Sequence, residues 1–439
     1  MSWKEEYESK ITSAEEAVKV IKNGDSVAFA YGTESRSLGL ALQNRAKELK
    51  DVRLFMPAPG RRFDWYDAGY EDNFNIQVAH ILPVVQKMMN EKRGDFLVGS
   101  MLWAHDIEDI GKTDVLIAQL SSPDKNGFCS FGSALWDKKQ AVRDAKIVLA
   151  EVNQHYIRTY GDNYVHVSEL DYIVEHVPSG RKPGATDMLG RENVGPSDIV
   201  KNIADHVSTL IRDGDCIEIG VGGAAEWIPR LGVFDDKNDI GVHAENLPPG
   251  IVDLVRKGVI TGRLKNNHKG KVVSTACGGS GKGDMDYINM NPLFELYESK
   301  YILDTRTIAA NDNVIAINSA LSVDLTGQIA AESLGHKMLS STGGQLAFAI
   351  GAALSKGGRC INVLPSAAKG GTVSRIVSAF EAGTVISVPR TLADIVVTEF
   401  GVAKLKGKTQ RQRTQELIAV AHPDFRAELQ KEAKKLYFS

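Results

Sequence analysis

Ile211-Arg212-Asp213-Gly214-Asp215, which leads into the apolar run Cys216-Ile217-Glu218-Ile219, repeats a pattern from the start of the chain. There, Ile21-Lys22-Asn23-Gly24-Asp25 leads into Ser26-Val27-Ala28-Phe29-Ala30. Two further pairs recur in the same order: Ser122-Pro123-Asp124 with Ser322-Val323-Asp324, and Asp171-Tyr172-Ile173-Val174 with Asp394-Ile395-Val396-Val397. Matching segments that keep one order along the chain indicate a tandem duplication.

Short apolar runs alternate with helical segments in both halves of the 439-residue chain. Such runs are typical of strands that are buried on both faces, and their alternation with helices predicts parallel sheets. A chain of this length also exceeds what a single core usually holds. We therefore predict an α/β fold of two tandemly duplicated α/β domains with mainly parallel sheets. A Pro- and Gly-rich linker over 176–198 puts their boundary near 185–197, which gives domains of 1–190 and 191–439.

Composition argues against several classes of protein. A net charge of −3 provides no field for nucleic acid or an anionic membrane. No apolar run approaches the roughly 20 residues that span a bilayer, and the polar, acidic start of the chain is unlike a signal peptide, so we expect a cytoplasmic protein. The four cysteines lie far apart without a C-x-x-C pair, and the histidines show no metal-binding spacing, so we expect reduced thiols and no metal.

Glu245 differs between the two copies of the repeat. Aligning Asp51-Val52-Arg53-Leu54-Phe55 with Asp239-Ile240-Gly241-Val242-His243 puts Pro57 opposite Glu245. Most glutamates in such positions are solvated loop residues, but Pro57 shows that this scaffold needs no acid here. A carboxylate among backbone donors and away from bulk water can act as a nucleophile. For His243, which points to the same face, a satisfied core imidazole is the favoured interpretation.

Three glycine turns follow or adjoin predicted strands of the second half: Gly220-Val221-Gly222-Gly223, Gly343-Gly344-Gln345 and Lys369-Gly370-Gly371. A strand-to-helix turn presents backbone N–H groups to an anion, although glycine also serves such turns for steric reasons alone. Turns after parallel strands converge on the carboxyl edge of a sheet, which is the usual ligand site of open α/β folds. We therefore expect the three turns to surround a site that contains Glu245.

Several motifs together resemble the acetyl-CoA hydrolase/transferase family, and within it the 4-hydroxybutyrate and butyrate CoA-transferases. They are Gly241 to Glu245, Gly258-Val259-Ile260-Thr261, Ile317-Asn318-Ser319, Asp324-Leu325-Thr326-Gly327-Gln328, Gly343-Gly344-Gln345, Ser374-Arg375-Ile376, Val397-Thr398-Glu399-Phe400-Gly401-Val402-Ala403 and Ala421-His422-Pro423. In the first half, Ser122-Pro123-Asp124-Lys125-Asn126-Gly127-Phe128 and Ser130-Phe131-Gly132 match as well. The resemblance covers nearly the whole chain.

The resemblance implies an enzyme that moves CoA between a short-chain acyl-CoA and a free carboxylic acid. It implies that Glu245 is the nucleophile of a ping-pong reaction through a glutamyl anhydride and a glutamyl-CoA thioester, that Val221 and Gly344 supply oxyanion donors, and that Asn311 orients the thioester. By the same resemblance, CoA would be held by Gly220, Gly222, Gly223, Gly343, Gln345, Lys369 and Gly370. It implies no metal and no permanently bound cofactor, only acyl-CoA and carboxylate as partners, and a homodimer.

Two alternatives to transfer remain open at this point. An acyl-CoA hydrolase on the same scaffold would use the same nucleophile, with water in place of the acceptor carboxylate. A non-catalytic CoA-binding protein would keep the fold and the glycine turns without the chemistry. The presence of Glu245 together with the glycine turns at 220–223 and 343–345 disfavours this alternative.

Overall fold

The structure, a computed structural model, describes residues 2–32, 34–99, 113–176, 195–278, 282–341 and 343–438. The predicted domain boundary at 190/191 and most of the linker lie outside these ranges. The chain forms two units, Met1–Arg191 with Thr275–Tyr301 (unit 1) and Glu192–Ser274 with Ile302–Ser439 (unit 2). The divisions between the units fall within β13 (Val272–Ala276) and at the end of α10 (Ser299–Ile302).

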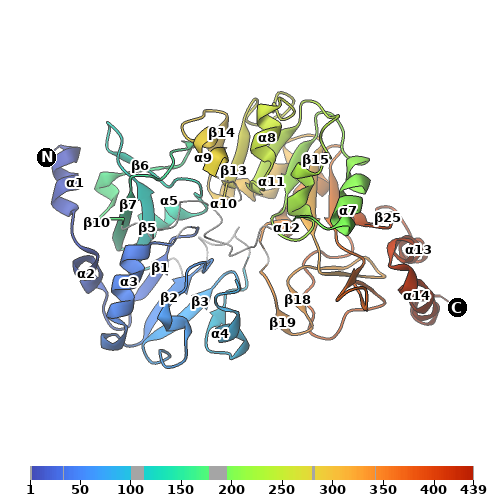
Figure 1. The fold of residues 1–439 in the computed structure, drawn as a ribbon, viewed down its shortest axis with the longest axis horizontal. Helices are drawn as coiled ribbons and strands as arrows, with labels where there is room; N and C mark the ends of the chain where they lie inside the picture. Colours follow the sequence, from blue (N-terminus) through green and yellow to red (C-terminus); the bar gives the residue numbers. More distant parts are fainter. Residues whose placement is uncertain are drawn as a thin grey trace. The chain divides into compact units, whose positions relative to one another are not determined.

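Unit 1 is built on a parallel sheet with the strand order β10-β7-β5-β1-β2-β3-β4, in which β1, β2 and β3 lie side by side (Figure 1). The strands are β1 Ser26–Phe29, β2 Val52–Met56, β3 Phe74–Val78, β4 Asp95–Phe96, β5 Val115–Ser121, β7 Ile147–Asn153 and β10 Tyr172–Glu175. The antiparallel pair β6 (Phe128–Ser130) and β9 (Tyr164–His166) and the parallel pair β8 (Tyr160–Gly161) and β14 (Phe294–Leu296) complete the strands. The helices are α1 Trp3–Lys10, α2 Ala14–Ala17, η1 Val18–Val20, α3 Arg36–Asn44, η2 Ala46–Glu48, η3 Asp64–Tyr66, α4 Gln86–Asn90, α5 Lys138–Asp144, η5 Val167–Glu169 and α9 Lys282–Ile288.

Unit 2 repeats this plan with the strand order β25-β24-β20-β15-β11-β12-β13. These strands are β11 Cys216–Ile219, β12 Gly241–Asn246, β15 Val314–Ser319, β20 Arg359–Val363, β24 Ile395–Thr398 and the antiparallel edge strand β25 Gly401–Lys404, besides β13. Short strands are β16 Ser322–Asp324, β17 Ile329–Ala330, β18 Ser333–Leu334, β19 Lys337–Met338, β21 Ala367–Ala368, β22 Val373–Ser374 and β23 Ile376–Val377. The helices are α7 Asp198–Ser208, η6 Ala225–Arg230, α8 Ile251–Arg256, α11 Thr305–Ala309, α12 Gln345–Leu354, α13 Gln410–Val420 and α14 Pro423–Tyr437.

Strand register confirms the duplicated α/β fold with mainly parallel sheets. The order β10-β7-β5-β1-β2-β3 of unit 1 corresponds strand by strand to β24-β20-β15-β11-β12-β13 of unit 2. Ser26 pairs with Arg53 in unit 1 as Cys216 pairs with Gly241 in unit 2, which is the alignment read from the sequence. The pairing of Asp51 with Asp239 in that alignment also fits, because both residues have a positive φ. The same register puts Pro57 opposite Glu245.

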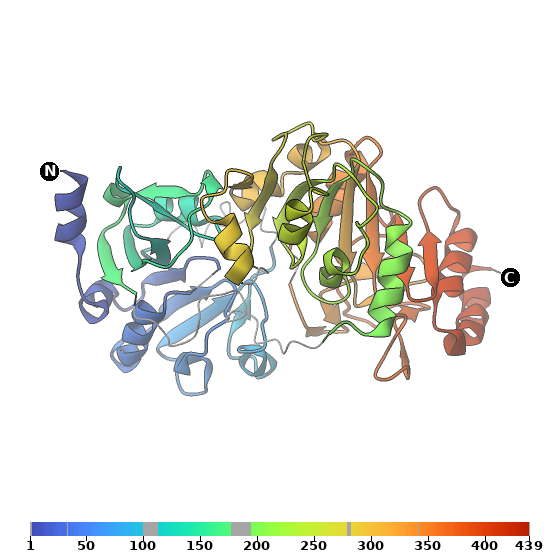
Figure 2. The same ribbon diagram turned by 45° about the horizontal axis from the view of Figure 1, so that its top comes forward.

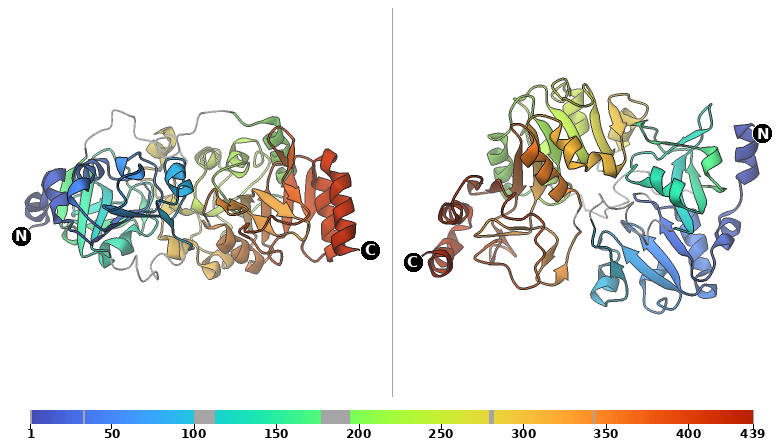
Figure 3. Two further views of the ribbon diagram at one scale, coloured as in Figure 1. Left: turned by 90° about the horizontal axis from the view of Figure 1, so that it is seen from below. Right: turned by 180° about the vertical axis from the view of Figure 1, so that it is seen from behind.

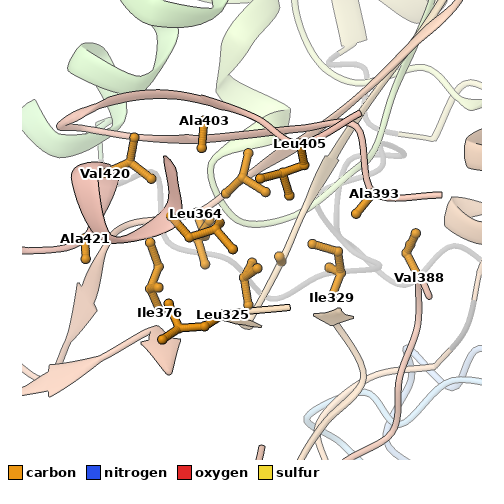
Figure 4. Packing of buried hydrophobic residues seen from close by; sticks show 14 of the residues in the cluster. Leu325, Ile329, Leu364, Ile376, Val388, Ala393, Ala403, Leu405, Val420 and Ala421 are labelled. Atoms are coloured by element: carbon orange, nitrogen blue, oxygen red, sulfur yellow. The ribbon is translucent and has the colours of Figure 1, made fainter. Parts of the chain in front are cut away.

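Three helices of unit 2, α7, α13 and α14, illustrate how its helices are capped and packed. The Ser197 side chain caps α7 by accepting from the N–H of Val200, and α7 packs against β24 and β25 (Figure 2). Near the C-terminus, α13 and α14 lie side by side in both views of Figure 3. They cover a core cluster that includes Leu325, Leu364 and Ile376 (Figure 4).

Candidate active site

Glu245 lies in unit 2 at the carboxyl end of β12. The structure extends this strand through Asn246, so Glu245 belongs to the strand itself and not to the loop that the sequence suggested. Residues 241–244 of the strand are buried, and Glu245, near the end of the strand, is half-buried. A strand fixes the direction of a side chain more firmly than a loop does, so the carboxylate has a defined position.

The first turn of α12 lies against the Glu245 carboxylate. The backbone N–H of Gly344, the residue that precedes α12, donates a hydrogen bond to this carboxylate. A Cβ on Gly344 would collide with Oε2 of Glu245 and would lie 2.7 Å from Cδ2 of Leu303. The helix N-terminus adds its partial positive charge to the hydrogen bond. Glycine at 344 is therefore what lets the carboxylate reach the end of the helix.

Burial raises the pKa of Glu245 to about 7, and the hydrogen bond from Gly344 opposes that rise. Removing a carboxylate from water disfavours its charged form, whereas a backbone donor favours it. Near neutral pH the group thus exchanges readily between an acid and a weakly solvated carboxylate. A poorly solvated carboxylate is a better nucleophile than one in bulk water.

His243 supports this arrangement from one step earlier on β12. Its Nε2 donates to the carbonyl oxygen of Ile302 over 2.9 Å, and its ring meets that of Phe348 of α12 edge-on. Burial lowers the pKa of the imidazole to about 3, so the ring is neutral. The contact holds the segment that carries Leu303, which packs beside Gly344. His243 is thus a core histidine with a positioning contact, as the sequence favoured.

The glycine turn at 220–223 is tied to the end of the neighbouring strand β15. Gly222 and Gly223 both have a positive φ, and the Ser319 hydroxyl donates to the carbonyl oxygen of Gly222 and accepts from the N–H of Ala225. The side chain of Val221 is 46% exposed at the outside of this turn. The turn continues β11, next to β12 in the sheet, so it lies at the same carboxyl edge as Glu245.

Gln345 connects α12 to a third strand of this edge. Its Nε2 donates to Oδ1 of Asn362 on β20 over 2.9 Å. Gly343 has a positive φ, and a Cβ added to it would lie 4.0 Å from Oε2 of Glu245. The structure therefore brings together Glu245 and the predicted turns at 220–223 and 343–345.

Three other predicted residues, Asn311, Lys369 and Gly370, lie in other parts of the unit. Asn311 precedes β15, at the edge of the sheet opposite to Glu245, where its Oδ1 accepts from the N–H groups of Asn266 and Asn267. Lys369 and Gly370 form the tip of the β21–β22 hairpin, where both have a positive φ. The turn at Lys369 and Gly370 thus connects two short antiparallel strands and is not a strand-to-helix turn.

Glu218 and Asn318 are polar residues of this edge that the sequence interpretation did not single out. Glu218 is only 3% exposed on β11, and its Oε2 accepts from Nδ2 of Asn318 over 2.8 Å. Burial raises the pKa of Glu218, the hydrogen bond from Asn318 lowers it, and the negative charge of Glu245 raises it further. The signal was present in the sequence, because Glu218 interrupts an apolar run in which the first copy has Ala28.

The described residues also bear on metal binding, disulfide formation and membrane insertion. Within the described ranges, no three or more His, Cys, Asp or Glu side chains gather as they would around a metal ion. All four cysteines are buried and unpaired, as expected. No helix in the described part of the chain combines the length and apolarity that crossing a membrane requires.

Comparison with known proteins gives matches along the whole chain. The model of the acetyl-CoA hydrolase/transferase N-terminal domain matches residues 1–179, and that of the C-terminal domain matches residues 282–433. The 4-hydroxybutyrate coenzyme A transferase of Clostridium kluyveri is 36% identical, with 100% of both chains covered. The butyryl-CoA:acetate CoA-transferase of Anaerostipes caccae is 33% identical over 99% of this chain and 98% of its own. Among solved structures, RipA from Yersinia pestis superposes with a TM-score of 0.90 at 32% identity, with both chains fully covered.

Proposed function

The chain belongs to the acetyl-CoA hydrolase/transferase family and is a CoA-transferase, and on this basis we propose a ping-pong mechanism in which Glu245 is the nucleophile. The enzyme transfers CoA between an acyl-CoA and a free carboxylate. The observation that carries the mechanism is the Glu245 carboxylate, raised in pKa by burial and held at the N-terminus of α12 by Gly344.

The proposed first half-reaction has two steps. A carboxylate oxygen of Glu245 attacks the carbonyl carbon of the acyl-CoA, the C–S bond breaks, and the sulfur leaves with the electron pair as CoA thiolate. The thiolate then attacks the γ-carboxyl carbon of Glu245 in the resulting mixed anhydride, and the acyl group leaves as a free carboxylate. The product is a glutamyl-CoA thioester, from which an acceptor carboxylate takes CoA by the same steps in reverse. The reactants and products of each step are similar in free energy. Covalent catalysis thus divides one difficult exchange between a carboxylate and a thioester into easier steps.

Two backbone donors support this route. The Glu245 oxygen that faces Gly344 remains the carbonyl oxygen of the anhydride and the thioester, so the N–H of Gly344 is placed to stabilise the oxyanion that forms when sulfur attacks the γ-carboxyl carbon. We assign the second donor, for the oxyanion on the substrate acyl group, to the N–H of Val221 in the neighbouring turn. The turns at 220–223 and 343–345 would hold the pantetheine end of CoA.

Short-chain acyl groups are the proposed substrates. The names of the two relatives described above refer to 4-hydroxybutyrate in one case and to butyryl-CoA with acetate in the other. We propose that this enzyme uses acyl-CoAs of the same size class, with a free short-chain acid as acceptor.

Intact-mass spectrometry tests the mechanism. The protein is incubated briefly with acetyl-CoA, butyryl-CoA, 4-hydroxybutyryl-CoA or succinyl-CoA and no acceptor acid, with Glu245→Ala alongside. We expect the wild type to gain the mass of CoA less one water, and the variant to gain nothing. Steady release of free CoA without an adduct would favour the hydrolase alternative, and neither adduct nor turnover would favour a binding protein.

The pH dependence of adduct formation should report the ionisation of Glu245. Attack requires the charged carboxylate, and its pKa of about 7 means that protonation removes the nucleophile as pH falls. The rate should therefore rise with pH through about 7, with a roughly tenfold loss per pH unit below it. Stopped-time mass measurements across roughly pH 5 to 9 check this. A rate constant that stays level over about pH 5.5 to 8 would contradict it.

A further inference from the structure

The duplicated register shows which polar residues unit 2 has added to the shared scaffold. In unit 1, Ala118 pairs with Ala150 as Asn318 pairs with Asn362 in unit 2, and Ala28 pairs with Leu116 as Glu218 pairs with Ala316. The equivalent positions are thus Ala28 and Glu218, Ala118 and Asn318, Ala150 and Asn362, and Pro57 and Glu245. Three buried alanines of one unit have become a carboxyl group and two amides in the other.

In unit 1, these positions contribute to the hydrophobic core. Ala28, Ala118 and Ala150 all belong to one buried apolar cluster. The scaffold is therefore stable with small apolar residues there, and a buried carboxyl group costs free energy unless it is well paired. Stability of the fold does not account for Glu218, so a role at the nearby site is the better explanation.

The contacts of Glu218 lie at the same edge of the sheet as Glu245. Asn318 donates to its Oε2, and the Oδ1 of the same amide lies so close to Gly220 that a Cβ there would collide with it. Gly220 follows Glu218 on the same face of β11, next to β12, which carries Glu245. Glycine at 220 thus leaves room for the amide of Asn318 at the carboxyl end of β11.

Few other titratable groups face Glu218. His243 on β12 is neutral because burial lowers its pKa to about 3, and burial raises the pKa of the Cys360 thiol on β20 to about 12. Asn318 on β15 does not titrate, and α12 carries no charged residue. Burial raises the pKa of Glu218 to about 8, the hydrogen bond from Asn318 lowers it, and the charge of Glu245 raises it further. Among these described groups, Glu218 and Glu245 are the pair that titrates near neutral pH.

We propose that Glu218 is a positioning residue of the active site that holds a proton while Glu245 carries the negative charge, and releases that proton when Glu245 is converted to its thioester. The inference rests on the proposed role of Glu245. Two carboxylates in one dry site repel each other, so the pair carries a single charge in those molecules in which Glu218 is still protonated. Thioester formation neutralises Glu245, which removes the repulsion and lets Glu218 ionise. The net charge of the pair then stays at one throughout the half-reaction.

The proposal predicts that a proton is released to solvent when the glutamyl-CoA thioester forms. The half-reaction itself converts one carboxylate and one thioester into another thioester and another carboxylate, so it neither takes up nor releases a proton. Ionisation of Glu218 adds one proton to the solvent for each Glu218 that was protonated at the start. At about pH 8, where about half of Glu218 is protonated, release should approach about half a proton per site.

A pH-indicator dye in weak buffer at about pH 8 measures this, with the acyl-CoA that gives most adduct and with adduct quantified by mass in the same sample. The wild type should release several-fold more protons per adduct than Glu218→Gln, in which only the roughly one-tenth of Glu245 still protonated contributes. Glu218→Gln keeps the shape and neutral charge of the acid, and Glu218→Ala copies the residue of unit 1. Both should still form the adduct, and Glu245→Ala gives the baseline.

The outcomes separate the two proposals. Adduct formation with equal proton release in the wild type and both Glu218 variants overturns the role of Glu218 and leaves the nucleophile intact. Absence of an adduct on the wild type overturns the glutamyl-CoA thioester of Glu245, and with it this inference. Adduct on all three proteins, with several-fold more protons released per adduct by the wild type than by either Glu218 variant, establishes the coupled pair.

Discussion

Replacing Glu245 by glutamine should reduce kcat/KM for CoA transfer by at least about 10⁴-fold, because the amide retains the size of the side chain but cannot attack a thioester. The glutamine side chain would still fill the space below Gly344, where Oε2 of Glu245 lies in the wild type. The loss should therefore appear in turnover and adduct formation, while the melting temperature and its increase on addition of CoA stay close to those of the wild type. Steady-state assays with butyryl-CoA and acetate measure the effect.

Glu245→Asp is the matched control for the charge. It preserves the carboxylate but withdraws it by one methylene from the N–H of Gly344 and from the substrate, so its activity should lie between those of the glutamine variant and the wild type. Turnover by Glu245→Gln within about tenfold of the wild type would exclude Glu245 as the covalent nucleophile, because removal of a true nucleophile costs several orders of magnitude.

Replacing Gly344 by alanine should lower kcat/KM by about 10²-fold or more, the second-largest effect we expect. The new Cβ would occupy the place of the Glu245 Oε2 atom and lie 2.7 Å from Cδ2 of Leu303, so the carboxylate must swing away from its donor. A displacement of about 1 Å at a reacting group is enough for a loss of this size. Gly344 has φ −92° and ψ −4°, which any residue adopts, so the effect comes from the side chain and not from backbone strain.

Gly195→Ala is the matched control for this substitution. A Cβ at Gly195 meets nothing within 4 Å, and its φ is not in the left-handed region, so activity should not change. Hydrogen exchange or thermal melting checks that Gly344→Ala still folds. If the alanine variant kept the activity and the pH profile of the wild type, the contact between Gly344 and the nucleophile would have no part in catalysis.

Pattern in the sequence was enough to predict the fold, and it singled out Glu245 as the candidate nucleophile. The repeat segments aligned strand by strand with the registers later found, because strands buried on both faces keep apolar runs that survive duplication. The contrast between Pro57 and Glu245 pointed to one carboxylate out of many. The same contrast between Ala28 and Glu218 was equally visible. A glutamate within an apolar run, however, cannot be assigned a role until the residues around it in the fold are known.

The duplicated α/β architecture, the family and the glutamate that one copy has and the other lacks could all be read from the chain alone. The folded molecule was needed to find that Gly344 lies against this glutamate, that Asn318 donates a hydrogen bond to Glu218, and that Asn311 lies at the far edge of the sheet. Strand order and helix packing bring together residues up to about a hundred positions apart, such as Glu245 and Gly344. The pKa of a carboxyl group depends on that assembled surrounding, on burial and on the charge beside it, and not on its neighbours in the chain.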